Sequence, residues 1–191
     1  DYAYGRKFWT DEYRLNAKIF EYPKPVVSFL KGFTMGGGVG IGCHGSHRIV
    51  GDTSQIAMPE VGVGLVPDVG GTLMLALAPE RLGEYLGTTA ARMNASDAIF
   101  AGFADMYIPE GKWPDLIQQL EQSGDVACLI SDTPADAGPI EAQMPEITKH
   151  FRGVSLSDVL TTLKNDDSAF AQTTLKQLRR NSPLAMACTF E

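Results

Sequence analysis

The 191-residue chain lacks several features that mark common functional classes. Its three cysteines, Cys43, Cys128 and Cys188, are odd in number and show neither CxxC nor Cys/His zinc spacing, which favours a reducing compartment over a disulfide scaffold. No apolar run approaches the ~20 residues of a membrane span, and no signal peptide is visible. The net charge of −7 argues against nucleic-acid binding. We therefore expect neither a membrane nor a nucleic acid as a partner.

Motifs for metal, nucleotide and serine-hydrolase chemistry are also missing. His44 and His47 lie three residues apart beside Cys43, but no third ligand is near and His150 is remote, so we expect no metal site. The glycine run does not complete GxGxxG, because Ile41 stands where the third glycine would be, and no GK[ST] follows it. No GxSxG elbow supports a serine triad, and adjacent Cys43 and His44 would point in different directions on a helix.

The pattern of apolar residues and breakers predicts an α/β protein. Composition is ordinary for a globular chain, with 44% hydrophobic and 20% charged residues. Helices are expected over 8–20, over 71–88 with a break at Pro79, and from a cap at Asn94 or Ser96, followed by helix-like segments beyond Pro109. Short strands are expected over 25–32 and 48–51, from Ser54, and over 104–108.

The stretch FTMGGGVGIG, residues 33–42, needs a physical reason because glycine weakens a helix or strand interior. Gly36, Gly37 and Gly38 follow an expected strand and open an expected helix. They could serve tight turning and close packing alone. Alternatively, their unobstructed amides could stabilise negative charge on a carbonyl oxygen during a reaction.

Two carboxylates downstream are the candidate acid, base or nucleophile. Glu60 and Asp68 each follow a proline in the apolar stretch AMPEVGVGLVPDVGG, and no lysine or arginine occurs between positions 49 and 80. A carboxylate in such surroundings finds a partner or has a raised pKa, and both outcomes are typical of catalytic groups. The alternative is that both are solvated loop acids.

Two longer segments resemble a known family. KPVVSFLKGFTMGGGVGIGCHGSHRIV, followed by IAMPEVGVGLVPDVGG, is similar to the crotonase (enoyl-CoA hydratase/isomerase) superfamily and most closely to its 3-hydroxyisobutyryl-CoA hydrolase branch. The likeness continues through YLGTTAARMNASDAIFAGFADMYI and LRRNSPLA. It implies a spiral of ββα units with a helical C-terminal region. We assign residues 1–130 to the core, expected to lack its N-terminal part, and 131–191 to an incomplete helical region.

The resemblance implies hydrolysis of a short branched hydroxyacyl-CoA thioester in valine catabolism. The acyl-CoA is the substrate, and no separate cofactor is expected. A homo-oligomer, trimer or hexamer, is possible, and the location would be the bacterial cytoplasm or the mitochondrial matrix. Two alternatives stay open, an enoyl-CoA hydratase or isomerase of the same superfamily and a non-catalytic, oligomer-forming member.

The same resemblance assigns roles to individual residues. Gly37 would supply an oxyanion N–H between its substrate-binding neighbours Gly36 and Gly38. Glu60 and Asp68 would carry the chemistry, with Glu60 as nucleophile or general base. Glu12, in the segment DEYRLN, would contact the substrate. Hydratases carry a second glutamate in a GGGxE arrangement, and Gly40 occupies that place in this chain.

Overall fold

A computed structural model of the protein describes residues 1–191. The chain forms two small parallel sheets that are surrounded by helices. One sheet has the strand order β1 (Val27–Leu30), β3 (His47–Val50), β5 (Met106–Tyr107), and the other pairs β2 (Phe33–Met35) with β4 (Gln55–Ala57). All three pairings are parallel. Two strands followed by a helix therefore recur along the chain, as the expected ββα units require.

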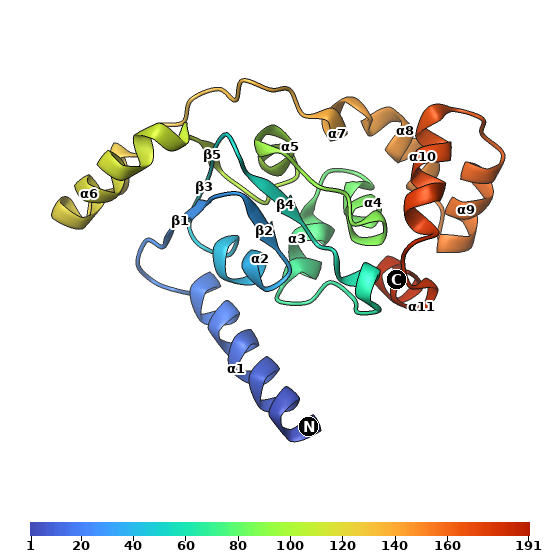
Figure 1. Ribbon diagram of the computed structural model, residues 1–191, viewed down its shortest axis with the longest axis horizontal. Coiled ribbons are helices and arrows are strands. Elements are labelled where there is room, and N and C mark those ends of the chain that lie inside the picture. The colour runs from blue at the N-terminus through green and yellow to red at the C-terminus, as the bar shows by residue number, and fades with distance from the viewer.

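The helices before residue 125 connect and cover these strands (Figure 1). Their bounds are α1 (Tyr2–Phe20), α2 (Gly37–Gly42), α3 (Gly71–Leu77), α4 (Leu82–Thr89), α5 (Ala95–Phe100) and α6 (Trp113–Ser123), with short 3-10 turns η1 (Glu60–Val63) and η2 (Glu110–Lys112). The break expected at Pro79 separates α3 from α4, and Asn94 caps α5 by accepting a hydrogen bond from the N–H of Asp97. Both sequence predictions are confirmed.

The last third of the chain is helical. It contains η3 (Val126–Cys128), α7 (Pro139–Ala142), α8 (Met144–Phe151), α9 (Leu156–Lys164), α10 (Ala169–Leu178) and α11 (Pro183–Phe190). Serine side chains cap the last three helices, and the α9 cap is a reciprocal capping box between Ser155 and Asp158. A chain segment running along the top of the view in Figure 1 connects α6 to α7.

A single apolar cluster joins the strands to these C-terminal helices. It contains 32 buried residues, from Leu30 in β1 to Met186 in α11, and includes Phe103, Phe151 and Leu163 at 0% exposure. A second cluster, Ile49, Ile108 and Trp113, packs α6 against the three-stranded sheet. The division at residue 130 that the sequence suggested stays a prediction.

Two elements differ from the sequence-based expectation. Strand β2 was not expected from the sequence: it lies just before the glycine triplet, where Thr34 and its neighbours pair in register with β4. Helix α1 begins six residues earlier than the apolar pattern indicated, since its first turns carry large hydrophobic side chains on exposed positions, such as Tyr2 at 88% and Tyr4 at 71%. The spacing of apolar residues predicts a helix only where one of its faces packs against the rest of the protein, and the first turns of α1 lack such a face.

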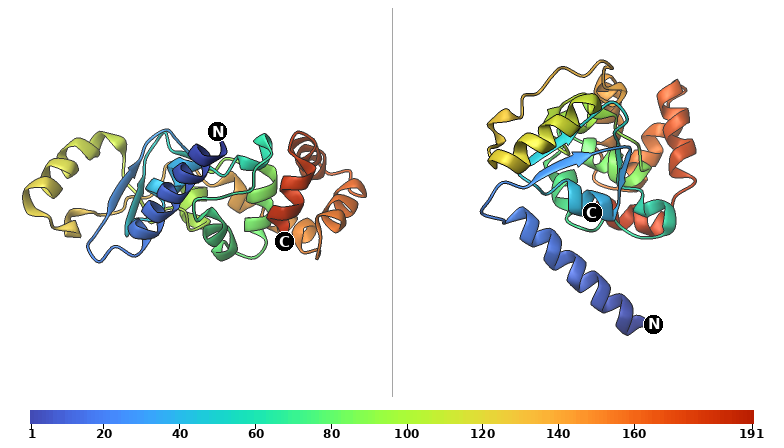
Figure 2. Two further views of the ribbon diagram at one scale, coloured as in Figure 1. Left: turned by 90° about the horizontal axis from the view of Figure 1, so that it is seen from below. Right: turned by 60° about the vertical axis from the view of Figure 1, so that its left-hand side comes forward.

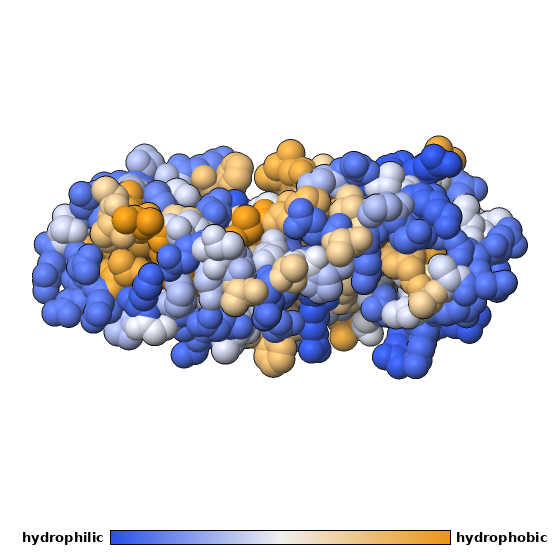
Figure 3. All heavy atoms as spheres, turned by 90° about the horizontal axis from the view of Figure 1, so that it is seen from above, coloured by the Kyte–Doolittle hydropathy of each residue, from blue (hydrophilic) through white to orange (hydrophobic).

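The elements form an elongated body from which α1 projects (Figures 1 and 2). The N-terminus lies at the free end of α1, and the C-terminus lies on the body beside α11. Figure 3 shows one face, on which hydrophobic side chains gather at the end occupied by α6 and hydrophilic ones cover most of the opposite end. No helix is both long enough and apolar enough to cross a bilayer.

Candidate active site

Parallel pairing of β2 with β4 places the glycine turn beside Glu60. The register aligns Met35 with Ala57, the last residues of the two strands. Both strands leave the sheet at the same edge, where β2 continues into Gly36 and β4 continues through Met58 and Pro59 into Glu60. A Cβ atom built on Gly36 would lie 3.2 Å from Glu60 Oε1. Two motifs that are 24 residues apart therefore meet at one sheet edge.

Glu60 is the least solvated carboxylate of this region. It is 6% exposed, it opens the turn η1, and neither of its carboxylate oxygens has a hydrogen-bond partner. Burial raises the pKa of Glu60 to about 7, and the negative charge of Asp68 adds to the rise. A carboxyl group with this pKa exchanges its proton near neutral pH, which suits a general base or nucleophile.

A hydrogen bond from the C-terminal helix α11 holds the backbone next to Glu60 in place. The carbonyl of Val61 accepts a hydrogen bond of 2.9 Å from the N–H of Ser182, the cap residue of α11. The N–H of Leu65 binds the carbonyl of Glu60 at 3.0 Å and closes the turn. The C-terminal helices therefore hold the turn on which the buried carboxylate sits.

The glycine triplet forms the opening of α2. Gly36 has φ = 53° and is the N-cap of α2, where no side chain caps the first N–H groups. Free N–H groups at a helix start favour negative charge. A Cβ on Gly37 would lie 2.9 Å from Glu12 Oε1, so glycine permits the close approach of that carboxylate. A Cβ on Gly38 would meet the Thr34 side chain at 3.8 Å, an ordinary contact.

A hydrogen bond from helix α1, which also carries Glu12, holds Asp68. Tyr13 donates its hydroxyl to Asp68 Oδ2 at 2.7 Å. The next two residues, Val69 at φ = 49° and Gly70 at φ = 78°, turn the backbone sharply into α3. Burial and this hydrogen bond raise the pKa of Tyr13 to about 12, so the phenol remains a donor at neutral pH. Asp68 is thereby held at the rim of the site.

Three carboxylates thus share one region without a cationic partner. None of the ion pairs in the structure includes Glu12, Glu60 or Asp68. Partial burial, with a smaller contribution from Asp68, raises the pKa of Glu12. The structure brings together Glu12, Glu60, Asp68, Gly36 and Gly37, and Gly38 follows Gly37 in the first turn of α2.

Gly40 has no room for a side chain. A Cβ at this position would lie 2.6 Å from Val69 Cβ and 2.8 Å from Asn16 Nδ2. Both atoms belong to tightly buried residues, with Val69 at 2% and Asn16 at 4% exposure. The place of the second glutamate in the GGGxE arrangement is therefore filled by residues from α1 and from the turn after Asp68.

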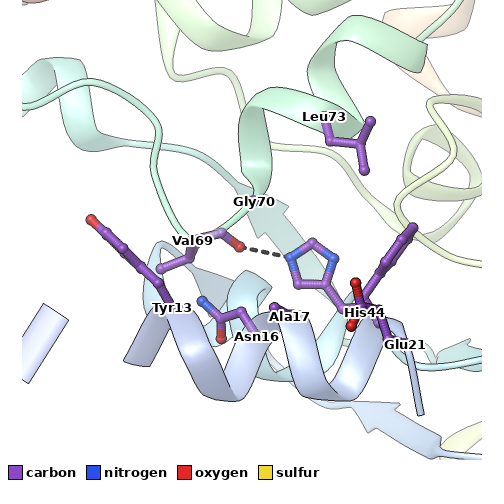
Figure 4. Close-up of a pocket in the computed structure, with 9 residues that line it drawn as sticks. Tyr13, Asn16, Ala17, Glu21, His44, Val69, Gly70 and Leu73 are labelled. Atoms are coloured by element: carbon purple, nitrogen blue, oxygen red, sulfur yellow. Dashed lines mark hydrogen bonds between the residues drawn. The ribbon is translucent and has the colours of Figure 1, made fainter. Parts of the chain in front are cut away.

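Beside this group, α1 and the start of α3 enclose a mainly apolar cavity of about 200 Å³ (Figure 4). Asn16 extends from α1 toward Val69, the Tyr13 hydroxyl points away from His44, and His44 Nε2 lies 2.6 Å from the carbonyl oxygen of Val69. A Cβ on Gly70 would lie 2.6 Å from the same His44 nitrogen. The histidine thus packs against the turn that follows Asp68.

Sequence reasoning missed Tyr13, Asn16 and His44 as parts of this region. A signal for Asn16 was present, because it lies four residues after Glu12 and positions i and i+4 share a helix face, whereas Tyr13 is adjacent to Glu12 and had no such signal. The sequence raised His44 only as a metal ligand or as a neighbour of a nucleophilic Cys43. Its contact with Val69 joins residues 25 positions apart and had no local signal.

Comparison with known proteins places the chain in a family. The family model described as enoyl-CoA hydratase/isomerase matches residues 1–191. A Xenopus tropicalis protein named mitochondrial 3-hydroxyisobutyryl-CoA hydrolase is 35% identical over 97% of this chain and 51% of its own length. The chain spans about half the length of the curated relatives it matches.

Two solved structures share the fold closely. An enoyl-CoA hydratase from Rhodobacter sphaeroides is 54% identical with a TM-score of 0.93, covering 99% of this chain and 55% of that one. A carnitinyl-CoA dehydratase from Mycobacterium thermoresistibile is 42% identical with a TM-score of 0.94, covering 99% and 56%. These matches confirm the crotonase-like ββα fold. This chain belongs to the enoyl-CoA hydratase/isomerase family of the crotonase superfamily.

Proposed function

We propose that the protein is an acyl-CoA thioester hydrolase that converts 3-hydroxyisobutyryl-CoA to 3-hydroxyisobutyrate and CoA, a reaction of valine catabolism. The observation that carries this proposal is Glu60, a buried carboxylate without a hydrogen-bond partner, beside the glycine opening of α2. Family membership supports an acyl-CoA substrate, and the names of the curated relatives support the hydrolase reaction.

In the proposed reaction, ionised Glu60 supplies the electron pair that attacks the thioester carbonyl carbon. It does so directly, giving a mixed anhydride that water then hydrolyses, or by taking a proton from the attacking water. Both routes break the C–S bond, release the CoA thiol and add one water molecule. Asp68, fixed by the Tyr13 hydroxyl, would orient the water or the acyl hydroxyl group.

Backbone amides at the start of α2 would stabilise the oxyanion that forms on the carbonyl oxygen. Gly37 is the first residue of that helix, and its N–H has no partner inside the helix because the first turn lacks preceding carbonyls. A donor that is fixed before the reaction stabilises developing charge without reorganising. Glu12, close to Gly37, would lie on the acyl side of the same turn.

Enoyl-CoA hydration is the second candidate, because the Rhodobacter sphaeroides structure at 54% identity has the name of a hydratase. The space around Gly40 argues against this activity. The hydratase arrangement places its second glutamate at this position, where even a Cβ would overlap Val69 and Asn16. The second carboxylate of this site is instead Asp68, eight residues beyond Glu60.

A comparison of two substrates tests the proposal. We expect the purified protein to release free thiol from 3-hydroxyisobutyryl-CoA, measured with a thiol reagent, and to leave the enoyl absorbance of crotonyl-CoA unchanged. Loss of enoyl absorbance without thiol release would assign the protein to the hydratases instead. Silence on both substrates from a well-folded sample would support the non-catalytic alternative.

A further inference from the structure

A second group of polar side chains lies in the C-terminal helices, away from the carboxylates of the candidate active site. Glu146 and His150 are four residues apart on α8, and Asp166 lies in the turn between α9 and α10. One ligand atom from each residue lies within 4.8 Å of the other two. The sequence did not indicate this group, because Asp166 is 16 positions from His150.

His150 is the unusual member of this group. It is 2% exposed, and neither ring nitrogen has a hydrogen-bond partner. Its ring stacks on Phe170, with the ring centres 5.9 Å apart and the planes at 19°. The ring is therefore fixed, with Nε2 directed at the two carboxylates. Nε2 contacts these carboxylates at ion-pair distances without a hydrogen bond, and a bound cation would coordinate this nitrogen, whereas Nδ1 would keep no partner.

The distances from His150 Nε2 to the two carboxylates are close to those of tetrahedral coordination. His150 Nε2 lies 3.2 Å from Asp166 Oδ2 and 3.6 Å from Glu146 Oε2. Zinc–nitrogen and zinc–oxygen bonds of about 2.0–2.2 Å give tetrahedral edges of roughly 3.3–3.6 Å. Glu146 and His150 also have the i, i+4 spacing that places two ligands on one helix face.

Asp166 is already oriented by its other oxygen. Oδ1 accepts a hydrogen bond of 2.7 Å from the N–H of Ser168, so Oδ2 faces His150. A hydrogen bond to a ligating group fixes its direction and supports metal binding. The fourth position of a tetrahedron would be taken by water, since the side chain of Glu146 is 41% exposed.

Lys149 competes for the same carboxylates. Its Nζ lies 2.5 Å from Asp166 Oδ2 and 3.2 Å from Glu146 Oε2. The lysine side chain is 52% exposed, so it can turn into solvent when another cation takes its place. The position of the ammonium group shows where positive charge is favoured. Because this group must leave before a metal ion can bind, it lowers the affinity for the metal.

We propose that Glu146, His150 and Asp166 form a binding site for Zn²⁺, completed by water, that links α8 to the turn between α9 and α10. A mixed nitrogen and oxygen ligand set suits Zn²⁺ better than Mg²⁺ or Ca²⁺, which prefer oxygen alone. The site is independent of the thioester chemistry, and its role is to stabilise the helical region.

Zinc titration of the protein by calorimetry, repeated with Co²⁺ as an optical probe of tetrahedral geometry, tests the proposal. We expect one equivalent to bind, and Tm to rise by roughly 5–10 °C at about 100 times Kd. Asp166→Asn keeps the oxygen that accepts from Ser168 and should weaken binding more than about tenfold. Lys149→Met should tighten it, whereas the exposed Lys164→Met should not.

Adventitious binding has a different signature. Zinc held by His47 and Cys43 would survive Asp166→Asn and be lost in His47→Ala, and that result would overturn the proposal. So would the absence of saturable binding, or equal affinities for the wild type and Lys149→Met. Circular dichroism of each variant before titration verifies that the helices are formed.

Discussion

Replacing Glu60 by glutamine is expected to lower kcat for thiol release from 3-hydroxyisobutyryl-CoA on the order of 10³-fold. The amide has nearly the shape of the carboxylate, but it can neither attack a carbonyl carbon nor accept a proton from water. Positioned acid–base groups contribute about 10²–10⁴-fold. Because substrate contacts are preserved, KM should change much less than kcat.

Stopped-flow thiol detection on the two proteins measures this effect. Glu121→Gln is the matched control, since Glu121 is an exposed glutamate on α6, remote in sequence from every residue of the site. Its kcat should equal that of the wild type. If Glu60→Gln kept at least a tenth of the wild-type kcat, Glu60 would not take part in the chemistry. Oxyanion stabilisation by the start of α2 would then be the remaining source of activity.

The same substitution is expected to stabilise the protein above pH 7. In the folded state burial raises the pKa of Glu60 from 4.5 to about 7. Between these two values the folded state binds more protons than the unfolded state. The free energy of unfolding therefore falls as pH rises through this window, and above pH 7 the buried charge costs up to about 3 kcal/mol.

Glutamine is neutral at every pH and does not incur this cost. We expect Tm of Glu60→Gln to exceed that of the wild type by about 5 °C at pH 8, and the difference to vanish below about pH 4, where Glu60 is protonated in both the folded and the unfolded state. Thermal unfolding in parallel with Glu121→Gln measures it. An equal or lower Tm at pH 8 would mean that interactions in the folded state offset the cost of burying the negative charge of Glu60.

Together, the two expected effects describe an active-site residue that is retained at the expense of stability. A buried carboxylate without a hydrogen-bond partner is unfavourable for folding. Its raised pKa is useful only if the group exchanges protons or attacks substrate near neutral pH. The absence of lysine and arginine between positions 49 and 80 is the sequence signal of this arrangement.

Much of the candidate site was predictable from local patterns. Pro59 and Pro67 mark the loops that carry Glu60 and Asp68, and the glycine triplet marks the opening of α2. The resemblance assigned Glu12 a contact with the substrate, and in the structure Glu12 Oε1 approaches Gly37. The catalytic and binding roles of these residues, like the predicted oligomer and the absence of a separate cofactor, remain predictions.

The remaining features depend on contacts between distant segments. Strand β2 exists because Phe33–Met35 pairs with Gln55–Ala57, and three residues carry too little alternation to reveal a strand. The exclusion of a side chain at Gly40 depends on Asn16, which the packing of α1 brings there, and on Val69 in the turn after Asp68. The hydrogen bond between Tyr13 and Asp68 spans 55 positions.

The pH dependence of kcat/KM for thiol release tests most directly whether Glu60 carries the chemistry. We expect the rate to rise with pH, with an apparent pKa near 7, and to reach a plateau above it, because only ionised Glu60 reacts. A profile that is flat between pH 5 and 8, or that rises near pH 4.5 as for an ordinary glutamate, would contradict this account.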